Sequence, residues 1–400
     1  MRRAGTVPSP LEGEGQGGGR LRVLRRPLTL QIVTWLAWLT LLIAVSILVV
    51  RSPIRSIFDA YRDGVHHWWA SEPLYNASDP RGFVYLTSSP LLFTPFVLLG
   101  PPFDDLLWRV CSVALFLFGI WRLVRILIPK HAPLAMAVIM LLILPASGVN
   151  VQRGQAEMAM AGMMFPGAAD AATQRWWRGA ALLCLGFALK PLALVLILLY
   201  GALYRPLRIP LAVGVLIVLA VPFLHSDPGY VLAQDRAMIE TLLTAAQPGV
   251  TRFNDVAMML HRFGADLPAA VMLAIRLVAA ALTLWLALVA VRTMPHAEGA
   301  ITVLALAVTY LVLFNPRTEL GSYMNLGALV GVSAATAWVR ERRMAAVLLA
   351  LLVLGLGTQA YGNWIYRPTD VWLKPLLGLV YFAYLVRRIC GRRLVTAPVG

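Results

Sequence analysis

Residues 20–50, RLRVLRRPLTLQIVTWLAWLTLLIAVSILVV, begin with four arginines in seven positions and continue with 24 residues that carry no charge. An uncharged helix of that length can cross the about 30 Å of bilayer hydrocarbon, and it is longer than the apolar core of a cleavable signal segment. We therefore predict a retained transmembrane helix at 28–50, anchored at the membrane surface by Arg22, Arg25 and Arg26.

The same kind of apolar stretch recurs along the whole chain. With 59% hydrophobic and only 14% charged residues, a 400-residue chain cannot keep its apolar surface out of water as a soluble globule. The sequence predicts an all-α integral membrane protein with about 10–12 transmembrane helices. Beyond the first span, we place predicted spans at 105–128, 132–148, 155–167, 206–224, 268–291, 299–314, 323–339, 344–361 and 370–387.

Most lysines and arginines fall in every second gap between these spans. The gaps that hold them are 1–26, 122–130, 175–178, 205–208, 292, 340–343 and 387–393. Together with Asp170 and Glu298, which lie near these gaps and are assigned to the same side, they carry 21 of the 35 basic residues but only five of the 19 acidic residues, whereas the rest of the chain carries 14 of each. Because cytoplasmic loops retain basic residues, we assign these gaps and both termini to the cytoplasmic side of the membrane. The 14 other acids then fall on the opposite face, where we look for a functional site.

The chain divides into one membrane domain and two tails. Residues 28–393 form the predicted polytopic domain, whose two long extracytoplasmic loops are 51–88 and 225–266. The first loop is aromatic and amphipathic, which favours a helix lying in the headgroup layer. Segment 1–27, rich in Gly and Glu, is predicted to be a disordered cytoplasmic tail, and 394–400 to be a second tail.

Charge and cysteine content argue against other classes of protein. The net charge of +16 lies beside span ends, where anionic lipid headgroups attract basic residues, so we expect membrane lipids and no nucleic acid as partners. Cys111, Cys184 and Cys390 lie in or beside apolar segments without CxxC spacing, and the sequence has no glycine-rich nucleotide motif. We therefore predict no metal site and no cofactor.

Two apolar stretches resist assignment to a simple span. Residues 86–102 contain four prolines, so we expect a re-entrant or interfacial segment there. Residues 179–204 have basic residues at both ends and Lys190-Pro191 in the middle. A single span would bury the lysine and put the two basic ends on opposite faces. We favour two half-helices that turn at Lys190, so that both ends stay cytoplasmic.

The first extracytoplasmic loop carries the clearest candidate for chemistry. It reads SIFDAYRDGVHHWWASEPLYN at 56–76, and Asp59 and Asp63 share one face if the segment is helical. Either carboxylate could act as a general base, and with His66 and His67 the acids are also compatible with a divalent cation. A solvated loop with incidental acids is the alternative, and no HxxxH or DxD signature strengthens the metal reading.

Three further segments place polar side chains on the same face. They are GVNVQRGQAEM at 148–158, the Lys190 turn, and FNPRTELGSYMNL at 314–326. Guanidinium and ammonium groups suit phosphate, whereas helix capping, snorkelling of the lysine and an Arg–Glu surface pair are the structural alternatives. The candidate substrate-binding residues are Gln152, Arg153, Gln155, Lys190, Arg317, Glu319 and Tyr323.

Several of these segments occur together in a known family. The chain contains EPLYN, FVYLTSSPLLFTPF, LWR, VQRGQAEM, GFALKPLALVLILLYGALYRPLR and FNPRTELGSY, in this order across about residues 55–325. In these motifs it resembles the multispanning glycosyltransferases that depend on polyprenyl phosphate, and glycosyltransferase family 87 most closely, which includes bacterial mannosyl- and arabinofuranosyltransferases.

The resemblance implies a type C glycosyltransferase architecture with a catalytic first extracytoplasmic loop, in a bacterial cell (inner) membrane. It implies transfer of a sugar, mannose foremost, from a polyprenyl-phosphate-sugar donor to a lipid or glycan acceptor, with inversion. An aspartate of the first loop would be the base, which is Asp59 here with Asp63 as its rival. Some members have a histidine in the loop that corresponds to 315–323; this chain has none, so Glu319 or Tyr323 fills that role or the role is absent.

A secondary transporter or a flippase of lipid-linked saccharides is the competing function. Its coupling acids belong near the bilayer midplane, and none of the predicted spans places an acid there.

Overall fold

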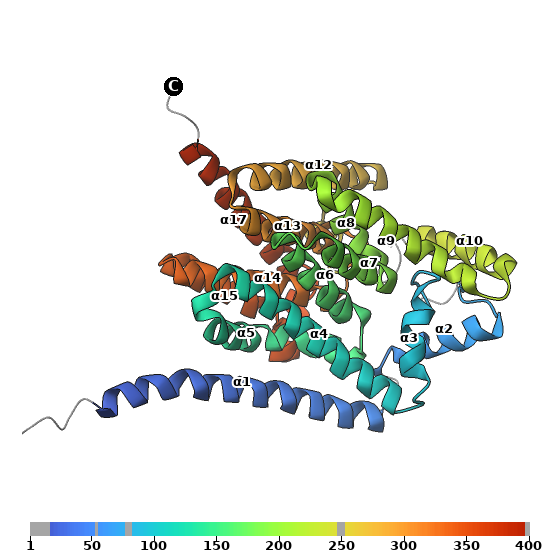
Figure 1. Cartoon of the computed structure of the whole chain (residues 1–400), viewed down its shortest axis with the longest axis horizontal. Helices are drawn as coiled ribbons and strands as arrows, with labels where there is room; N and C mark the ends of the chain where they lie inside the picture. Colours follow the sequence, from blue (N-terminus) through green and yellow to red (C-terminus); the bar gives the residue numbers. More distant parts are fainter. Residues whose placement is uncertain (1–16, 53–54, 77–81, 246–252, 397–400) are drawn as a thin grey trace, which may run out of the picture.

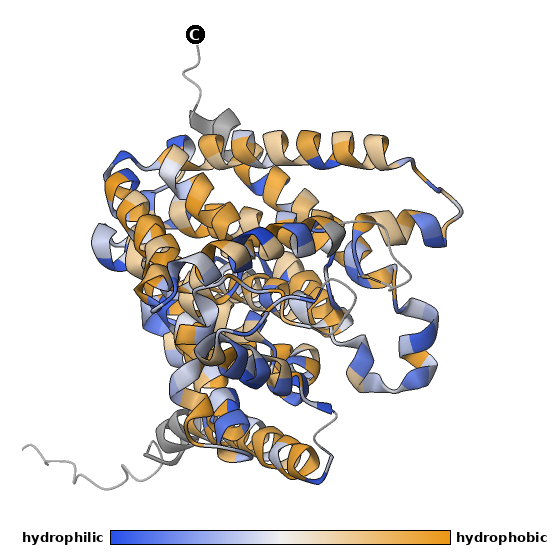
Figure 2. Cartoon of the chain, turned by 90° about the vertical axis from the view of Figure 1, so that its right-hand side faces the viewer, coloured by the Kyte–Doolittle hydropathy of each residue, from blue (hydrophilic) through white to orange (hydrophobic). Residues whose placement is uncertain are grey.

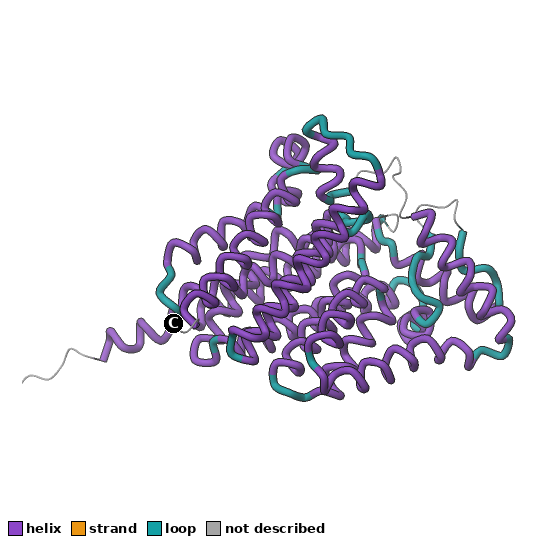
Figure 3. Tube along the Cα trace, turned by 90° about the horizontal axis from the view of Figure 1, so that it is seen from above, coloured by secondary structure: helices purple, strands orange, loops and turns teal. Residues whose placement is uncertain are grey.

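The computed structural model describes residues 17–52, 55–76, 82–245 and 253–396, and these residues form helices and loops without strands (Figure 3). The helices named in Figure 1 are α1 (Gly17–Arg51), α2 (Phe58–Ala70), α3 (Ser89–Val97), α4 (Phe103–Leu127), α5 (Ala132–Arg153), α6 (Ala156–Ala172), α7 (Trp176–Leu189), α8 (Leu194–Leu203), α9 (Arg208–Ala220), α10 (Pro228–Ala245), α11 (Val256–Arg262), α12 (Ala269–Thr293), α13 (His296–Phe314), α14 (Tyr323–Val339), α15 (Arg343–Gly355), α16 (Asn363–Thr369) and α17 (Leu373–Thr396).

Each of the ten predicted spans overlaps a helix, and the all-α membrane architecture is confirmed. In the described part of the chain, six helical segments are long and apolar enough to cross a membrane, or seven if α16 and α17, bent by 69°, form one span. The helices α6, α14 and α15 are shorter. The predicted span at 344–361 is too long, because α15 ends at Gly355 and a 3₁₀ turn follows at Thr358–Tyr361.

The boundary of the N-terminal tail also differs from the prediction. Helix α1 begins at Gly17, so residues 17–27 belong to a helix, whereas residues 1–16 lie outside the described part. An apolar helix can extend by several turns beyond the bilayer when its arginines stay in water. The start of α1 and the end of α17 lie at one end of the bundle, opposite α2 and α10 (Figure 1).

Helix α6 forms the centre of the bundle and packs against α4, α7 and α13. Its alanines and glycines allow neighbouring backbones to approach closely, as is typical of helices in membranes. A Cβ on Gly162 would lie 2.7 Å from the carbonyl carbon of Leu115, so only glycine fits between α4 and α6 at that point. By contrast, α1 and α12 expose long rows of apolar side chains that suit lipid, including Ile32, Trp35, Leu277 and Val278. Apolar residues dominate most of the long helices, and hydrophilic residues gather in some of the shorter helices and in the loops (Figure 2).

The stretch 179–204 is a hairpin, as predicted. The chain breaks at Lys190, whose extended backbone separates α7 from the 3₁₀ turn Pro191–Ala193 and α8. The ring of Trp176, at the start of α7, lies 6.2 Å from that of Tyr204, just after α8. A continuous helix would separate these residues by about 40 Å. Both ends of the hairpin therefore meet, and Lys190 is at its tip.

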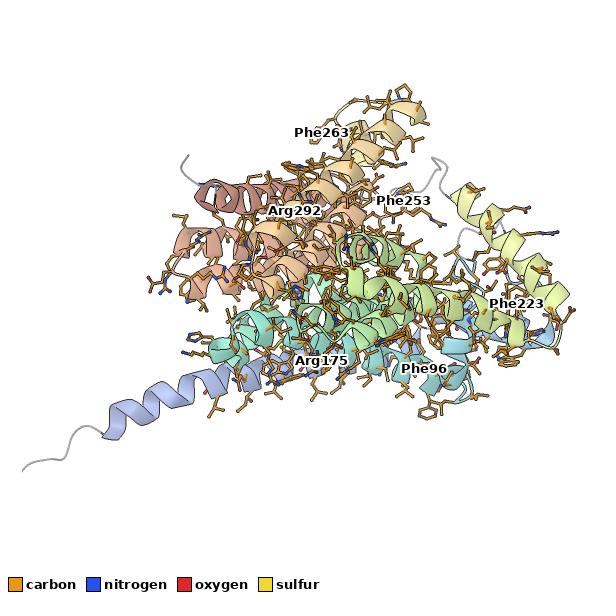
Figure 4. The ribbon with its side chains drawn as sticks, turned by 45° about the horizontal axis from the view of Figure 1, so that its top comes forward. Phe96, Arg175, Phe223, Phe253, Phe263 and Arg292 are labelled. Atoms are coloured by element: carbon orange, nitrogen blue, oxygen red, sulfur yellow. The ribbon has the colours of Figure 1, made fainter. Side chains whose placement is uncertain are left out.

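The predicted interfacial elements are short helices at the end opposite the termini. The nine-residue α3 replaces a continuous span at 86–102 and packs against α2 and α4. Helix α2 buries Phe58, Tyr61, Val65 and Trp68 on one face and exposes Trp69 on the other. Figure 4 labels Phe96 and Phe223 near this end, and Arg175 and Arg292 nearer to the end where α1 begins.

Topology can be tested by cysteine labelling in a background without the three native cysteines. We expect a cysteine that replaces the exposed Glu72 to react with an impermeant maleimide in spheroplasts, because the basic gaps predict a cytoplasmic location for the opposite end. A cysteine in place of the exposed Glu341 is the matched control and should react only after permeabilisation. The reverse pattern would mean an inverted protein.

Candidate active site

The first loop docks onto the connection between α5 and α6. The Ile57 N–H donates to the carbonyl of Arg153 at 2.9 Å, and the Tyr61 hydroxyl accepts from the Ala156 N–H at 3.1 Å. Between them, the indole N–H of Trp108 donates to the carbonyl of Gly154 at 2.8 Å. Helix α2 is thereby attached to the start of the central helix.

Gly154 makes this connection possible. Its φ is +66°, a left-handed conformation that glycine adopts without strain, and a Cβ there would lie 3.2 Å from the side chains of both Arg109 and Asp105. Arg109 is buried and donates to the carbonyls of Val151 and Gln152 at the end of α5. It also contacts the Ser56 hydroxyl and Asp105 at 2.8 and 2.9 Å. One guanidinium therefore joins α4, α5 and the start of the first loop.

Two of the predicted polar segments, 148–158 and 314–326, are in contact at Glu319. Its carboxylate accepts a hydrogen bond from the Gln155 amide and lies 3.8 Å from the guanidinium of Arg153. The side chains of Arg153 and Glu319 are 49% and 39% exposed, so both can reach a ligand. Gln152 contributes its carbonyl to Arg109, and its side chain is half-buried.

The turn that carries Glu319 is held from three sides. The Asn150 amide donates to the Gly321 carbonyl at 2.5 Å, and the ammonium of Lys374 donates to the Leu320 carbonyl at 3.3 Å. Together with Gln155 on Glu319, these bonds fix three consecutive residues from α5, α17 and the α5–α6 connection. Lys374 is fully buried and also binds the Gln359 amide oxygen at 2.5 Å.

The two other residues proposed near this turn point elsewhere. Tyr323 is fully buried, and its hydroxyl donates to backbone carbonyls of Asn254 and Val312, so it holds the turn in place. Arg317 lies 5.7 Å from the ring centroid of Phe253. The alternative of an Arg317–Glu319 surface pair is not realised, because Glu319 pairs with Arg153 instead.

Lys190 lies at the same end, paired with an acid that we did not predict. It forms an ion pair with Glu157, and the side chains are 17% and 3% exposed. The ammonium also lies 6.0 Å from the ring centroid of Tyr85. The lysine therefore neither snorkels freely nor remains unpaired.

A pair of tyrosine hydroxyls lies between α2 and the acids Glu157 and Glu319. The hydroxyls of Tyr61 and Tyr85 are 2.9 Å apart, in the middle of the buried aromatic cluster under α2. Burial raises the pKa of both hydroxyls above the usual value, and the charges of Glu157 and Glu319 raise it further. Glu157 and Glu319 therefore both lie close enough to raise the pKa of the same two hydroxyls, which stay neutral.

Asp59 and Asp63 differ in their surroundings. Asp59 is 53% exposed and accepts a hydrogen bond from Arg62, whose Nε donates to buried Asp104 at 2.7 Å. The hydrogen bond to Asp104 is the main cause that raises the pKa of Arg62. Asp63 is exposed, and no ion pair of its side chain occurs within the described residues. His67 lies 3.7 Å from Glu72, and no three His, Cys, Asp or Glu side chains of the described residues form a group able to hold a metal ion.

The comparison with known proteins agrees with the sequence motifs. The family model described as glycosyltransferase family 87 matches residues 83–316, more than half of the chain. The chain belongs to glycosyltransferase family 87. No curated protein matches it. This family-87 protein is therefore a membrane glycosyltransferase, with a sugar donor and an acceptor. The matched region contains Arg153, Gln155 and Lys190, but begins after α2 and ends before Glu319.

Sequence reasoning missed several polar residues of this glycosyltransferase. The rule that singled out Lys190, a charge inside an apolar stretch, also applies to Glu157, Arg109 and Lys374. Asp104 opens a span and looked like an ordinary acid near a helix start. Its complete burial under Arg62 depends on how α2 folds back, which no local pattern shows.

The hydrogen bonds that fix the turn at residues 319–321 can be tested by a substitution at Gly321. A Cβ there would lie 2.5 Å from the Gln155 amide oxygen and 2.8 Å from the Asn150 amide nitrogen. These side-chain ends can move, but moving them breaks their bonds to the turn. We expect Gly321→Ala to lower the free energy of unfolding by about 1–3 kcal/mol in detergent. Gly148→Ala, with nothing within 4 Å of its Cβ, is the control and should not destabilise; equal losses would contradict the prediction.

Proposed function

We propose that this enzyme transfers a sugar, mannose foremost, from a polyprenyl-phosphate-sugar donor to a hydroxyl of a lipid or glycan acceptor. Transfer takes place on the extracytoplasmic face of the bacterial inner membrane, with both termini in the cytoplasm. One observation carries the proposal: an exposed carboxylate and two cations, from α2, α5 and the α7–α8 hairpin, gather at the end of the bundle opposite the termini.

Asp59 is the proposed general base, with Asp63 as its rival. It removes the proton of the acceptor hydroxyl, whose oxygen attacks the anomeric carbon of the donor sugar. The bond between that carbon and the phosphate oxygen breaks as the new bond forms on the opposite side, so the configuration inverts. The released lipid phosphate gains negative charge, which Lys190 and Arg153 are placed to stabilise.

A cavity near Lys190 is too small for the apolar chain of the donor. Its volume is about 20 Å³, and it lies between α6 and α13 with Glu157, the partner of Lys190, in its lining. Most of the other lining side chains are apolar, namely Met160, Ala161, Met164, Phe165, Leu192, Val308, Leu311 and Val312. The polyprenyl chain of the proposed donor therefore stays in the surrounding lipid, and only its phosphate approaches the hairpin tip.

The proposed base is tested by Asp59→Asn and Asp63→Asn, assayed with saturating polyprenyl-phosphate sugar and acceptor. We expect Asp59→Asn to lower turnover by about 10²- to 10⁴-fold, since a positioned base is lost, while the protein remains folded. Asp63→Asn, one turn along the same exposed face, is the matched control and should retain turnover. Near wild-type turnover in both variants would move the base elsewhere, first to Glu319.

The role of Lys190 is tested by Lys190→Met. We expect the KM for the lipid donor to rise by about tenfold or more, with little change for the acceptor, because a cation near the phosphate is lost. Since this change leaves Glu157 buried without its partner, Lys190→Met/Glu157→Gln removes both charges and separates binding from stability. Lys130→Met, an exposed lysine of a basic gap, is the control. An unchanged donor KM in the folded double variant would end the assignment.

A further inference from the structure

We propose that Arg62 and Asp104 form a positioning pair that fixes the carboxylate of Asp59 for catalysis. The inference rests on the proposed function, in which Asp59 is the base. Neither Arg62 nor Asp104 needs to touch the substrate. Their role is to hold one exposed side chain in one orientation.

Asp59 has little else to hold it. It lies in the first turn of α2, its side chain is 53% exposed, and an exposed aspartate samples several rotamers. The Nη1 of Arg62 reaches its Oδ1 at 2.5 Å, and the Nε of the same guanidinium reaches the Asp104 Oδ2 at 2.7 Å. The guanidinium also lies 5.8 Å from the ring centroid of Phe58. Because a guanidinium is planar and rigid, fixing one edge on Asp104 fixes the direction of the other.

Asp104 is a firm anchor for this arrangement. It is fully buried in the first turn of α4, where the helix dipole favours a carboxylate, and its Oδ1 accepts the Asp105 N–H at 2.7 Å. Helix α4 packs along the central α6, so the anchor belongs to the helix bundle and not to the loop. Asp104 also neutralises Arg62, so that Asp59 is oriented without a net positive charge beside it.

The arrangement distinguishes the two candidate bases. Asp63 lies one turn further along α2 and is exposed, without an ion pair among the described residues. Of the two candidates, Asp59 alone is connected through an arginine to the helix bundle in the described residues. The Arg62–Asp104 pair therefore fixes the orientation of the Asp59 carboxylate and leaves that of Asp63 free to vary.

Kinetics of the purified full-length enzyme test the pair. We expect Asp104→Asn and Arg62→Gln each to lower kcat by about 10- to 100-fold, as misplacement of a catalytic group does, with the KM for polyprenyl-phosphate sugar and acceptor changed by less than about threefold. Asp170→Asn is the matched control: that aspartate is also fully buried and pairs with Arg122 at 2.5 Å, but at the other end of α6. It should lose stability and keep the kcat of the folded enzyme.

The outcomes separate this inference from the proposed function. Wild-type kcat in folded Asp104→Asn, with Asp59→Asn inactive, would overturn the positioning pair and leave the base in place. Full activity of Asp59→Asn would overturn the base itself. If Asp104→Asn does not fold, Arg62→Gln/Asp104→Asn removes the buried carboxylate and its half-buried partner together: a low kcat in that variant supports the pair, and a wild-type kcat overturns it.

Discussion

The hydrogen bond between the Ala156 N–H and the Tyr61 hydroxyl is the contact on which the rest of the site depends. It attaches α2, a helix outside the bundle, to the first residue of α6, the helix at the centre of the bundle. Gln155 and Glu157 flank Ala156 in sequence and bind Glu319 and Lys190, respectively. This docking point, together with the Ile57–Arg153 hydrogen bond and the Arg62–Asp104 pair, sets the position of Asp59 relative to both charged clusters.

The pairing of buried acids with basic residues explains why the charged clusters at this end of the bundle are stable. A charged group taken out of water is costly unless hydrogen bonds and an opposite charge satisfy it, and here each of the buried acids Asp104, Asp105 and Glu157 has a basic partner on another turn or helix. These pairs sit at helix ends, where backbone groups also need partners. Ion pairs thus connect the helices and loops at the polar end of the bundle, while the apolar outer faces of the helices suit lipid.

The sequence predicted the membrane helices, the hairpin at Lys190 and the gathering of polar segments at one end, because hydropathy, proline and the distribution of charge act locally. It did not predict the partners. Arg153 binds Glu319 across 166 positions of sequence, whereas the neighbouring Arg317 stacks over Phe253. Nor could it distinguish Asp59 from Asp63, because the difference lies in Asp104, which reaches Arg62 only after α2 folds back onto α4. Such long-range pairings leave no periodic signal.

The most direct test of the account is sugar transfer by the purified protein in proteoliposomes, supplied with a panel of radiolabelled polyprenyl-phosphate sugars or with the corresponding nucleotide sugars. The account predicts that label moves to a lipid or glycan acceptor from at least one polyprenyl-phosphate sugar and from none of the nucleotide sugars. Polyprenyl-phosphate mannose is the donor expected to give the highest transfer. Transfer from a nucleotide sugar alone would contradict it, because the donor would then not be a lipid phosphate held at Lys190.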